Sequence, residues 1–135
     1  MSVSIMLSDG RFSLNDRSLA ILANRILKAE RAAGKTINII YCSDEYIKKL
    51  NRRFKGENGS TDVLAFDMCE RSEPNFIGEV YINLQQARRQ ARENHVPYGQ
   101  EIRRLTIHGI LHLLGYRDGD REERSKMWSR QESYL

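Results

Sequence analysis

The segment TIHGILHLLGYRDGD, residues 106–120, decides both how the chain folds and where its chemistry lies. Its apolar residues extend a helical pattern, and Gly115 stands where a helix would end in a left-handed conformation. We therefore predict a helix over about 100–114. Since His108 and His112 are four residues apart, their side chains lie on one face of that helix with Cβ atoms about 6 Å apart.

The rest of the chain alternates between strand-like and helix-like patterns. Runs rich in β-branched residues predict strands at about 3–7, 36–42, 60–68 and 76–84. Amphipathic or polar periodic segments predict further helices at about 16–32, 44–54, 84–94 and 121–133. Because strands and helices alternate, we expect an α/β or α+β fold. It would be a single domain over residues 1–135, with a small mixed four-stranded sheet packed by helices.

Short polar residues and glycines mark the predicted helix ends. Ser43 and Asn83 stand where N-caps are expected, and either Asn15 or Asp16 can cap the first helix. Gly34 is expected to end that first helix.

Composition narrows the class of protein only loosely. The chain has 40% hydrophobic and 30% charged residues and a formal net charge of +4, with arginine outnumbering lysine. This basic bias suits a polyanionic partner without identifying one. No export signal and no apolar run of about 18 residues is visible, so we expect a cytoplasmic protein without a membrane span. Cys42 and Cys69 form no CxxC motif and are expected to be reduced, core-filling thiols.

The histidine pair has the spacing of a metal site. Two imidazoles one helical turn apart can reach one ion at about 2.0–2.1 Å, and the break at Gly115 can return Asp118 to the same ion. The pattern HxxxHxxGxxD is similar to the metzincin pattern HExxHxxGxxH, with aspartate as the last ligand. Asp120 is an alternative third ligand, and HxxxH alone is also compatible with a purely structural pair. His95 follows a predicted helix end and is interpreted as a surface or C-capping residue.

Gly109 stands where a zinc peptidase carries its catalytic glutamate. A glycine can neither take a proton from the attacking water nor pass it to a leaving amine. Phosphodiester cleavage depends less on such a group, because a metal ion stabilises charge on the phosphoryl oxygens. The site therefore favours metal-assisted phosphoryl chemistry over proteolysis.

Basic residues gather in two groups that could guide RNA to such a site. Taken singly, each group is more often a solvated helix face, and for Arg88 and Arg92 pairing with nearby acids is the alternative. They are Lys48, Lys49, Arg52, Arg53 and Lys55 in one segment, and Arg88, Arg89, Arg92, Arg103 and Arg104 in another.

Four blocks of the sequence resemble the YbeY family of rRNA maturation factors, in the family's order. Residues 108–118, HGILHLLGYRD, resemble HGxLHLxGYDH, and residues 54–67, FKGENGSTDVLAFD, resemble YRGxDxPTDVLSFP. GEVYI at 78–82 resembles GDIxI, and MWSRQESYL at 127–135 resembles MxxxQExxL. The resemblance covers nearly the whole chain.

The resemblance implies a metal-dependent, single-strand-specific endoribonuclease acting in rRNA maturation and ribosome quality control. It implies metal ligands at His108 and His112, and at Asp118 where the family has a third histidine. Lys55 stands where the family has a functional arginine, which implies a catalytic role in contacting phosphate. Arg52 and Arg53 are expected to assist substrate binding.

The two departures from the family change the expected chemistry. A carboxylate ligand leaves a divalent site with net charge +1 instead of +2, so a coordinated water should be less acidic. Zinc is the first expectation for the single divalent ion, and Asp118 makes Mn²⁺ or Mg²⁺ compatible as well. At position 55, the compact ammonium group of lysine replaces the planar guanidinium of the family's arginine, which could hold two phosphate oxygens.

The expected partners are single-stranded RNA, including rRNA, and the ribosome or its proteins, whereas the oligomeric state is not predicted. The alternatives are a non-catalytic ribosome-assembly factor, a metallohydrolase of peptides or small molecules, and a structural domain whose histidines only pack.

Overall fold

A mixed sheet with strand order β1-β2-β4-β3 forms the centre of the fold. The computed structural model describes residues 3–8, 16–68 and 74–135. β1 (Val3–Leu7), β2 (Thr36–Cys42) and β4 (Phe76–Asn83) are parallel neighbours, and β3 (Val63–Asp67) is an antiparallel edge strand beside β4. The predicted mixed four-stranded sheet is confirmed.

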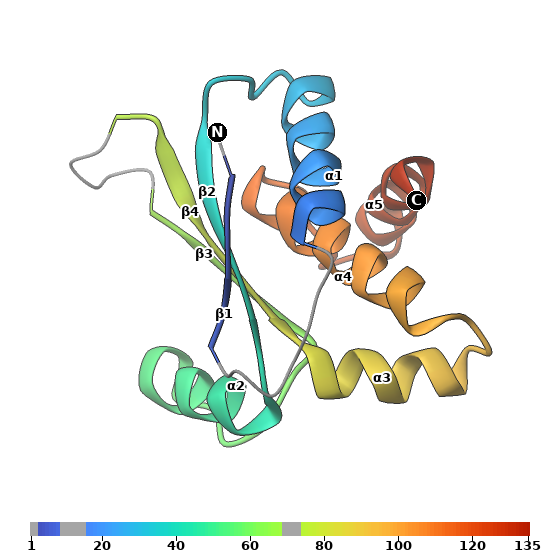
Figure 1. Cartoon of the computed structure of the whole chain (residues 1–135). Helices are drawn as coiled ribbons and strands as arrows, with labels where there is room; N and C mark the ends of the chain where they lie inside the picture. The colour runs from blue at the N-terminus through green and yellow to red at the C-terminus, as the bar shows by residue number, and fades with distance from the viewer. Residues whose placement is uncertain (1–2, 9–15, 69–73) are drawn as a thin grey trace.

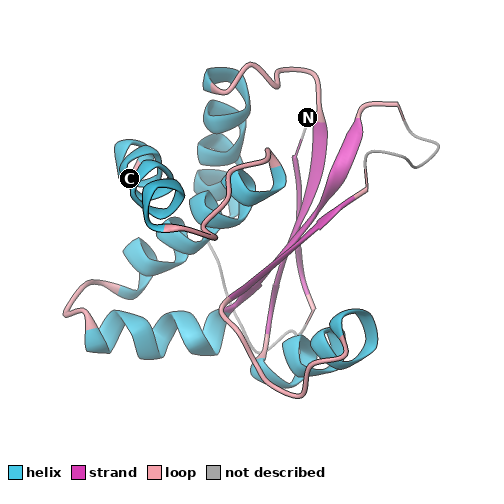
Figure 2. Ribbon diagram, turned by 180° about the vertical axis from the view of Figure 1, so that it is seen from behind, coloured by secondary structure: helices cyan, strands magenta, loops and turns pink. Residues whose placement is uncertain are grey.

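The helices are distributed unevenly over the two faces of this sheet (Figures 1 and 2). α1 (Asp16–Ala29) and α4 (Tyr98–Leu113) cover one face, and α5 (Arg121–Tyr134) lies beyond α4. α2 (Asp44–Leu50), its π-helical continuation η1 (Asn51–Lys55) and α3 (Leu84–Glu93) follow the ends of β2 and β4. Among the described residues, no helix combines the length and apolarity needed to cross a membrane.

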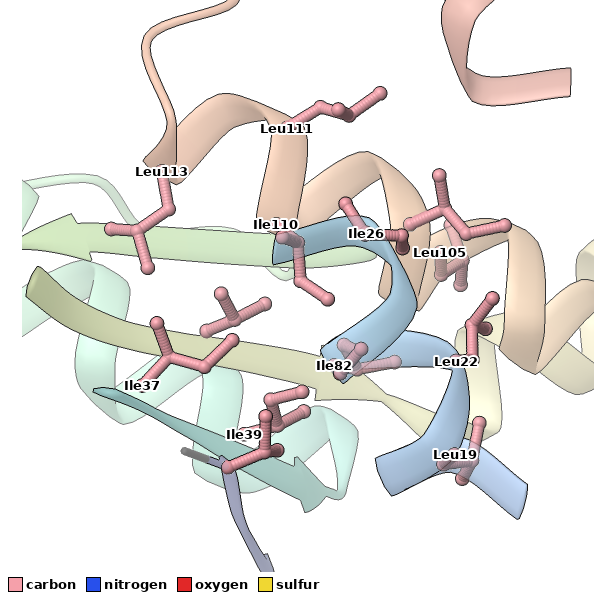
Figure 3. Packing of buried hydrophobic residues seen from close by; sticks show 14 of the residues in the cluster. Leu19, Leu22, Ile26, Ile37, Ile39, Ile82, Leu105, Ile110, Leu111 and Leu113 are labelled. Carbon is pink, nitrogen blue, oxygen red and sulfur yellow. The ribbon is translucent and has the colours of Figure 1, made fainter. Parts of the chain in front are cut away.

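The main core lies between the sheet and the pair α1 and α4 (Figure 3). The apolar stripe predicted for α1 is buried there through Leu19, Leu22 and Ile26. In β2, alternate residues such as Ile37 and Ile39 face the same core. A smaller cluster on the opposite face packs α2 against the sheet through Ile47, Cys42 and Leu64. Cys42 is thus a core residue as predicted, and Cys69 lies outside the described residues.

The predicted caps at Ser43 and Asn83 are confirmed, whereas the end predicted for the first helix is wrong. Ser43 Oγ accepts from the amide of Tyr46, and the Asn83 side chain accepts from the amide of Gln86. α1 ends at Ala29, well before Gly34. The Asn15 alternative lies outside the described residues.

A hydrogen bond five residues back explains the early end of α1. The amide of Ala32 donates to the carbonyl of Leu27 at 2.7 Å, and Arg31 takes the left-handed position with φ of 60°. This geometry closes the last turn of α1, as in a Schellman motif. Arg31 therefore occupies the position that sequence rules assign to glycine.

α4 approaches the sheet so closely that only a glycine fits at position 109. A Cβ atom there would lie 2.3 Å from Val80 Cγ1 of β4 and 3.0 Å from Val63 Cγ1 of β3. Gly109 therefore faces the sheet, on the buried side of α4. Packing accounts for this glycine, and the position offers no room for a catalytic glutamate.

We predict that Gly109→Ala lowers the free energy of unfolding, because the overlap with Val80 costs about 2–3 kcal/mol and outweighs a helix-propensity gain of about 1 kcal/mol. Gly99→Ala is the matched control, because it lies in the same helix and its Cβ would meet nothing within 4 Å. Urea unfolding should show that variant to be as stable as the native chain or more stable.

A double-mutant cycle with Val80→Ala tests the cause of the loss. If the overlap is responsible, the double variant loses less stability than the sum of the two single losses, by about 1 kcal/mol or more. Additive losses would contradict the steric explanation.

Candidate metal centre

The histidine pair projects from the last two turns of α4 with both rings turned to the same point. The Nε2 atoms of His108 and His112 are 3.1 Å apart, and the ring planes are inclined by 80°. Both residues are half-buried. Ligands of a tetrahedral zinc ion, each about 2.1 Å from it, lie about 3.4 Å apart. The separation of the two nitrogens therefore suits a shared ion.

The chain reverses after α4 and brings Asp118 to the same point. Gly115 has φ of 102°, and the amide of Tyr116 donates to the carbonyl of Leu111 at 3.0 Å, which closes the helix as the sequence predicted. Asp118 Oδ2 then lies 3.4 Å from His112 Nε2. One ligand atom from each of His108, His112 and Asp118 falls within a 4.8 Å group.

Asp120, the alternative third ligand, has a different task. Its Oδ1 accepts from the amide of Glu123 at 2.8 Å and caps α5. Among the described residues, only His108, His112 and Asp118 form a group of potential metal ligands. His95 lies at the end of α3 with φ of 54°, exposed and apart from this group, as the sequence indicated.

Hydrogen bonds at the outer nitrogens fix which ring nitrogen can bind a cation. His108 Nδ1 donates to Gln131 Oε1 at 2.6 Å, and His112 Nδ1 donates to the Tyr116 carbonyl at 3.2 Å. The Gln131 amide is itself oriented, because its Nε2 donates to Glu132 at 3.2 Å. With the protons held at Nδ1, both Nε2 lone pairs point into the cluster. Two such lone pairs 3.1 Å apart repel one another unless a cation lies between them, so the donor set fits a metal ion.

The protonation state of His112 favours the same role. Burial lowers the pKa of His112, and the neighbouring His108 lowers it further, while Asp118 partly opposes both. The imidazole therefore remains neutral at neutral pH, the form that binds metals.

A cleft of about 350 Å³ opens in front of the three residues. Its lining includes Lys55, from the end of η1, Asp62, which directly precedes β3, and Asp67, the last residue of β3. The structure thus brings Lys55 to the candidate centre from a distant part of the chain. Arg52 and Arg53 are exposed on the same turn, but they do not line this cleft.

Two of the arginines expected to guide RNA form ion pairs with acidic residues of the protein itself. Arg89 pairs with Asp44 at 2.6 Å, and Arg104 pairs with Glu101 and Glu132 at 3.0 Å each. The hydrogen bonds from Arg89 lower the pKa of Asp44 to about 2. Pairing with nearby acids, expected for Arg88 and Arg92, is thus observed at Arg89 and Arg104.

Sequence reasoning missed the two residues that support the centre from a distance. Gln131 is buried and meets His108 across 23 residues; the sequence signal was its place in the C-terminal block MWSRQESYL. Asn83, expected only as a cap, also donates to Asp44 at 2.6 Å and to the Thr61 carbonyl at 3.1 Å. These bonds hold the segment between Lys55 and β3 against the end of β4.

We predict that Asp118→Asn lowers the pKa of His112 further in metal-free protein. The carboxylate stabilises the imidazolium, so its removal favours the neutral ring. An NMR titration of the histidine ring protons in chelator measures the shift. Asp120→Asn is the matched control, since asparagine also caps helices, and it should leave the pKa of His112 in place. Equal shifts in the two variants would contradict the assignment.

Comparisons with known proteins agree with this geometry. The family model described as Endoribonuclease YbeY matches residues 6–135. An Endoribonuclease YbeY of Persephonella marina is 39% identical over 119 residues, covering 85% of this chain and 76% of the relative. The relative of that name in Pelotomaculum thermopropionicum is 35% identical, and the match covers 100% of this chain and 95% of the relative.

A solved structure is similar over almost the same extent. The solution structure of a Thermotoga maritima protein superposes with a TM-score of 0.66 at 28% identity, covering 98% of this chain and 85% of that one. The resemblance seen in the four sequence blocks is thereby confirmed, and the chain belongs to the YbeY family.

Proposed function

We propose that this chain is a metal-dependent endoribonuclease that cuts single-stranded RNA. The observation that carries the proposal is the meeting of His108, His112 and Asp118 within 4.8 Å at a cleft that Lys55 also lines. The name Endoribonuclease YbeY, shared by the family model and the relatives, supports the same activity. Residues 1–135 would form one catalytic domain.

His108, His112 and Asp118 would hold one divalent ion, for which zinc is our first assignment and Mn²⁺ or Mg²⁺ the alternatives. A bound ion supplies Lewis acidity, which stabilises negative charge on a phosphodiester and activates water. Gln131 and the Tyr116 carbonyl keep the imidazole protons at Nδ1 and so orient both Nε2 atoms. Asp118 lowers the net charge of the centre relative to three imidazoles.

Lys55 would place its ammonium against a phosphate oxygen of the strand in the cleft. Arg52 and Arg53, exposed on the same turn, would contact phosphates outside it. Gly109 argues against the peptidase alternative, because its position faces Val80 and has no space for a proton-transferring side chain.

The biological setting follows from the family. We assign the chain to rRNA maturation and ribosome quality control in the cytoplasm, with the ribosome or its proteins as partners. A non-catalytic assembly factor remains the competing assignment, and the cleavage assay below separates the two.

We predict that His112→Ala removes both bound metal and RNA cleavage while the domain stays folded. The reason is that one of three ligand atoms is lost. Elemental analysis and cleavage of a labelled single-stranded oligoribonucleotide, with and without chelator, measure the two effects. His95→Asn is the control, because His95 is exposed, does not line the cleft, and has a left-handed backbone that asparagine tolerates. Undiminished cleavage by the His112 variant would refute the proposal, and metal binding without cleavage in the native chain would favour the assembly factor.

We predict that Lys55→Ala lowers kcat/KM for RNA by about tenfold or more, through loss of a charged phosphate contact. Lys55→Arg should keep or raise activity, because guanidinium can hold two phosphate oxygens. Lys49→Ala removes another exposed lysine, which lies on the preceding helix and does not line the cleft, and should change kcat/KM little. Equal losses in the Lys55 and Lys49 variants would show that only general surface charge matters.

A further inference from the structure

A second and larger hollow adjoins the cleft of the candidate metal centre. It has a volume of about 480 Å³ and shares Asp62 and His108 with that cleft. The remainder of its lining comes from the end of α3 and from α4 and α5. A strand lying in the metal cleft would therefore pass directly beside this hollow.

Trp128 of α5 borders the hollow with an exposed indole. Met127, Gln131 and Tyr134 form the buried side of α5, and Trp128 lies one helical turn before Gln131, which contacts His108. The Trp128 residue is nevertheless 57% exposed. A large flat side chain left open beside a candidate active site is suited to stacking against a flat ligand.

The charges of the hollow are unsuitable for a phosphate group. Its arginine, Arg104, is held by Glu101 and Glu132 at 3.0 Å each, so the acids around it neutralise its charge. The Arg104 guanidinium carbon lies over the Trp128 ring, 5.9 Å from its centre. Asp62 adds a further negative charge. An uncharged group fits this lining better than an anion.

Amide side chains provide groups that can recognise the edge of such a ligand. Gln90 of α3 and Asn94, the C-cap of that helix, both line the hollow. Gln90 Nε2 already donates to Asp62 at 3.3 Å. An amide offers both a donor and an acceptor, which matches the mixed edges of nucleobases. Val96 and Leu105 complete an apolar wall.

We propose that this hollow is a nucleobase subsite, in which Trp128 stacks on an unpaired base of the strand whose phosphate lies at the metal centre. This inference rests on the proposed function and adds the reason for its strand selectivity. Bases of a duplex are paired and stacked on one another, so they cannot enter the hollow, whereas a base of a single strand can. Substrate selection would thus depend on Trp128 of α5, which is not one of the proposed metal ligands.

Trp128 is the chain's one tryptophan, so its fluorescence reports on the subsite directly. The full chain, loaded with metal, is mixed rapidly with RNA and read before products accumulate. Three probes are compared: a single-stranded oligoribonucleotide, an abasic sugar–phosphate oligomer of equal length, and a preformed duplex. We expect saturable quenching with the single strand and little with the other two. Equal quenching by the abasic oligomer, or none by the single strand, would overturn the proposal.

Variants separate base stacking from the rest of binding. Because stacking of one base on an aromatic residue contributes about 1–3 kcal/mol, Trp128→Ala should weaken the affinity for labelled single-stranded RNA about tenfold, measured by anisotropy. Trp128→Phe should restore most of the affinity. Ile21→Ala is the control, since Ile21 is also exposed (61%) but lies on α1. Circular dichroism confirms that each variant is folded.

The two proposals fail in different ways. If native protein binds the single strand with quenching but never cuts it, the subsite stands and the nuclease assignment fails. If the strand is cut and Trp128→Ala changes neither affinity nor KM, the nuclease assignment stands and the subsite is refuted.

Discussion

The close approach of α4 to strands β3 and β4 is the constraint on which the rest of the structure depends. Because position 109 lacks a side chain, α4 can lie against Val80 and Val63 with no Cβ between them. His108, the preceding residue, and His112, one turn further on, are then placed half-buried at the edge of the cleft that β3 also lines. A larger residue at 109 would move both histidines away from Lys55 and Asp62 on the opposite wall. The same glycine that excludes a peptidase-type base thus sets the geometry of the candidate centre.

A second constraint ties the histidines to α1 and α5. Glu30 at the end of α1 accepts hydrogen bonds from the Tyr116 hydroxyl at 2.7 Å, from Arg130 Nε at 2.6 Å and from the Tyr134 hydroxyl. Burial alone would raise the pKa of Glu30, but the hydrogen bonds outweigh it and the pKa lies below its ordinary value. The carboxylate therefore stays ionised and holds the turn after α4, whose Tyr116 carbonyl orients His112. The contacts of Glu30 therefore help to keep His112 oriented, although Glu30 does not line the cleft.

The features predicted from sequence are those set by local geometry. The spacing of His108 and His112, the left-handed Gly115 and the return to Asp118 all lie within one helix end, where a few dihedral angles determine the outcome. The first helix shows the limit of such rules, since the bond from Ala32 to Leu27 closes it with Arg31, and not a glycine, in the left-handed position. Gln131 and Asn83 could not be placed because their partners are 23 and 39 residues away. The pairing of Arg104 with Glu132 is long-range for the same reason, and it removed a cation that sequence alone counted as surface charge.

Under the proposed function, the charge of the cleft would make RNA binding there dependent on the ion. Among the residues that line it are three aspartates, Asp62, Asp67 and Asp118, and one lysine, Lys55, a formal charge of −2 with neutral histidines. A negative formal charge of this kind disfavours phosphate, and a divalent cation held by the proposed ligands would bring it to zero. The third histidine of the family pattern would carry no such negative charge, so Asp118 would make this chain more dependent on the ion for admitting a strand. In the adjoining hollow Arg104 is already paired with its acids, and the base proposed to enter it is uncharged, so binding there would not share this dependence. Under the two proposals, phosphate recognition would depend on the metal and base recognition on the indole of Trp128, so the two would be separable.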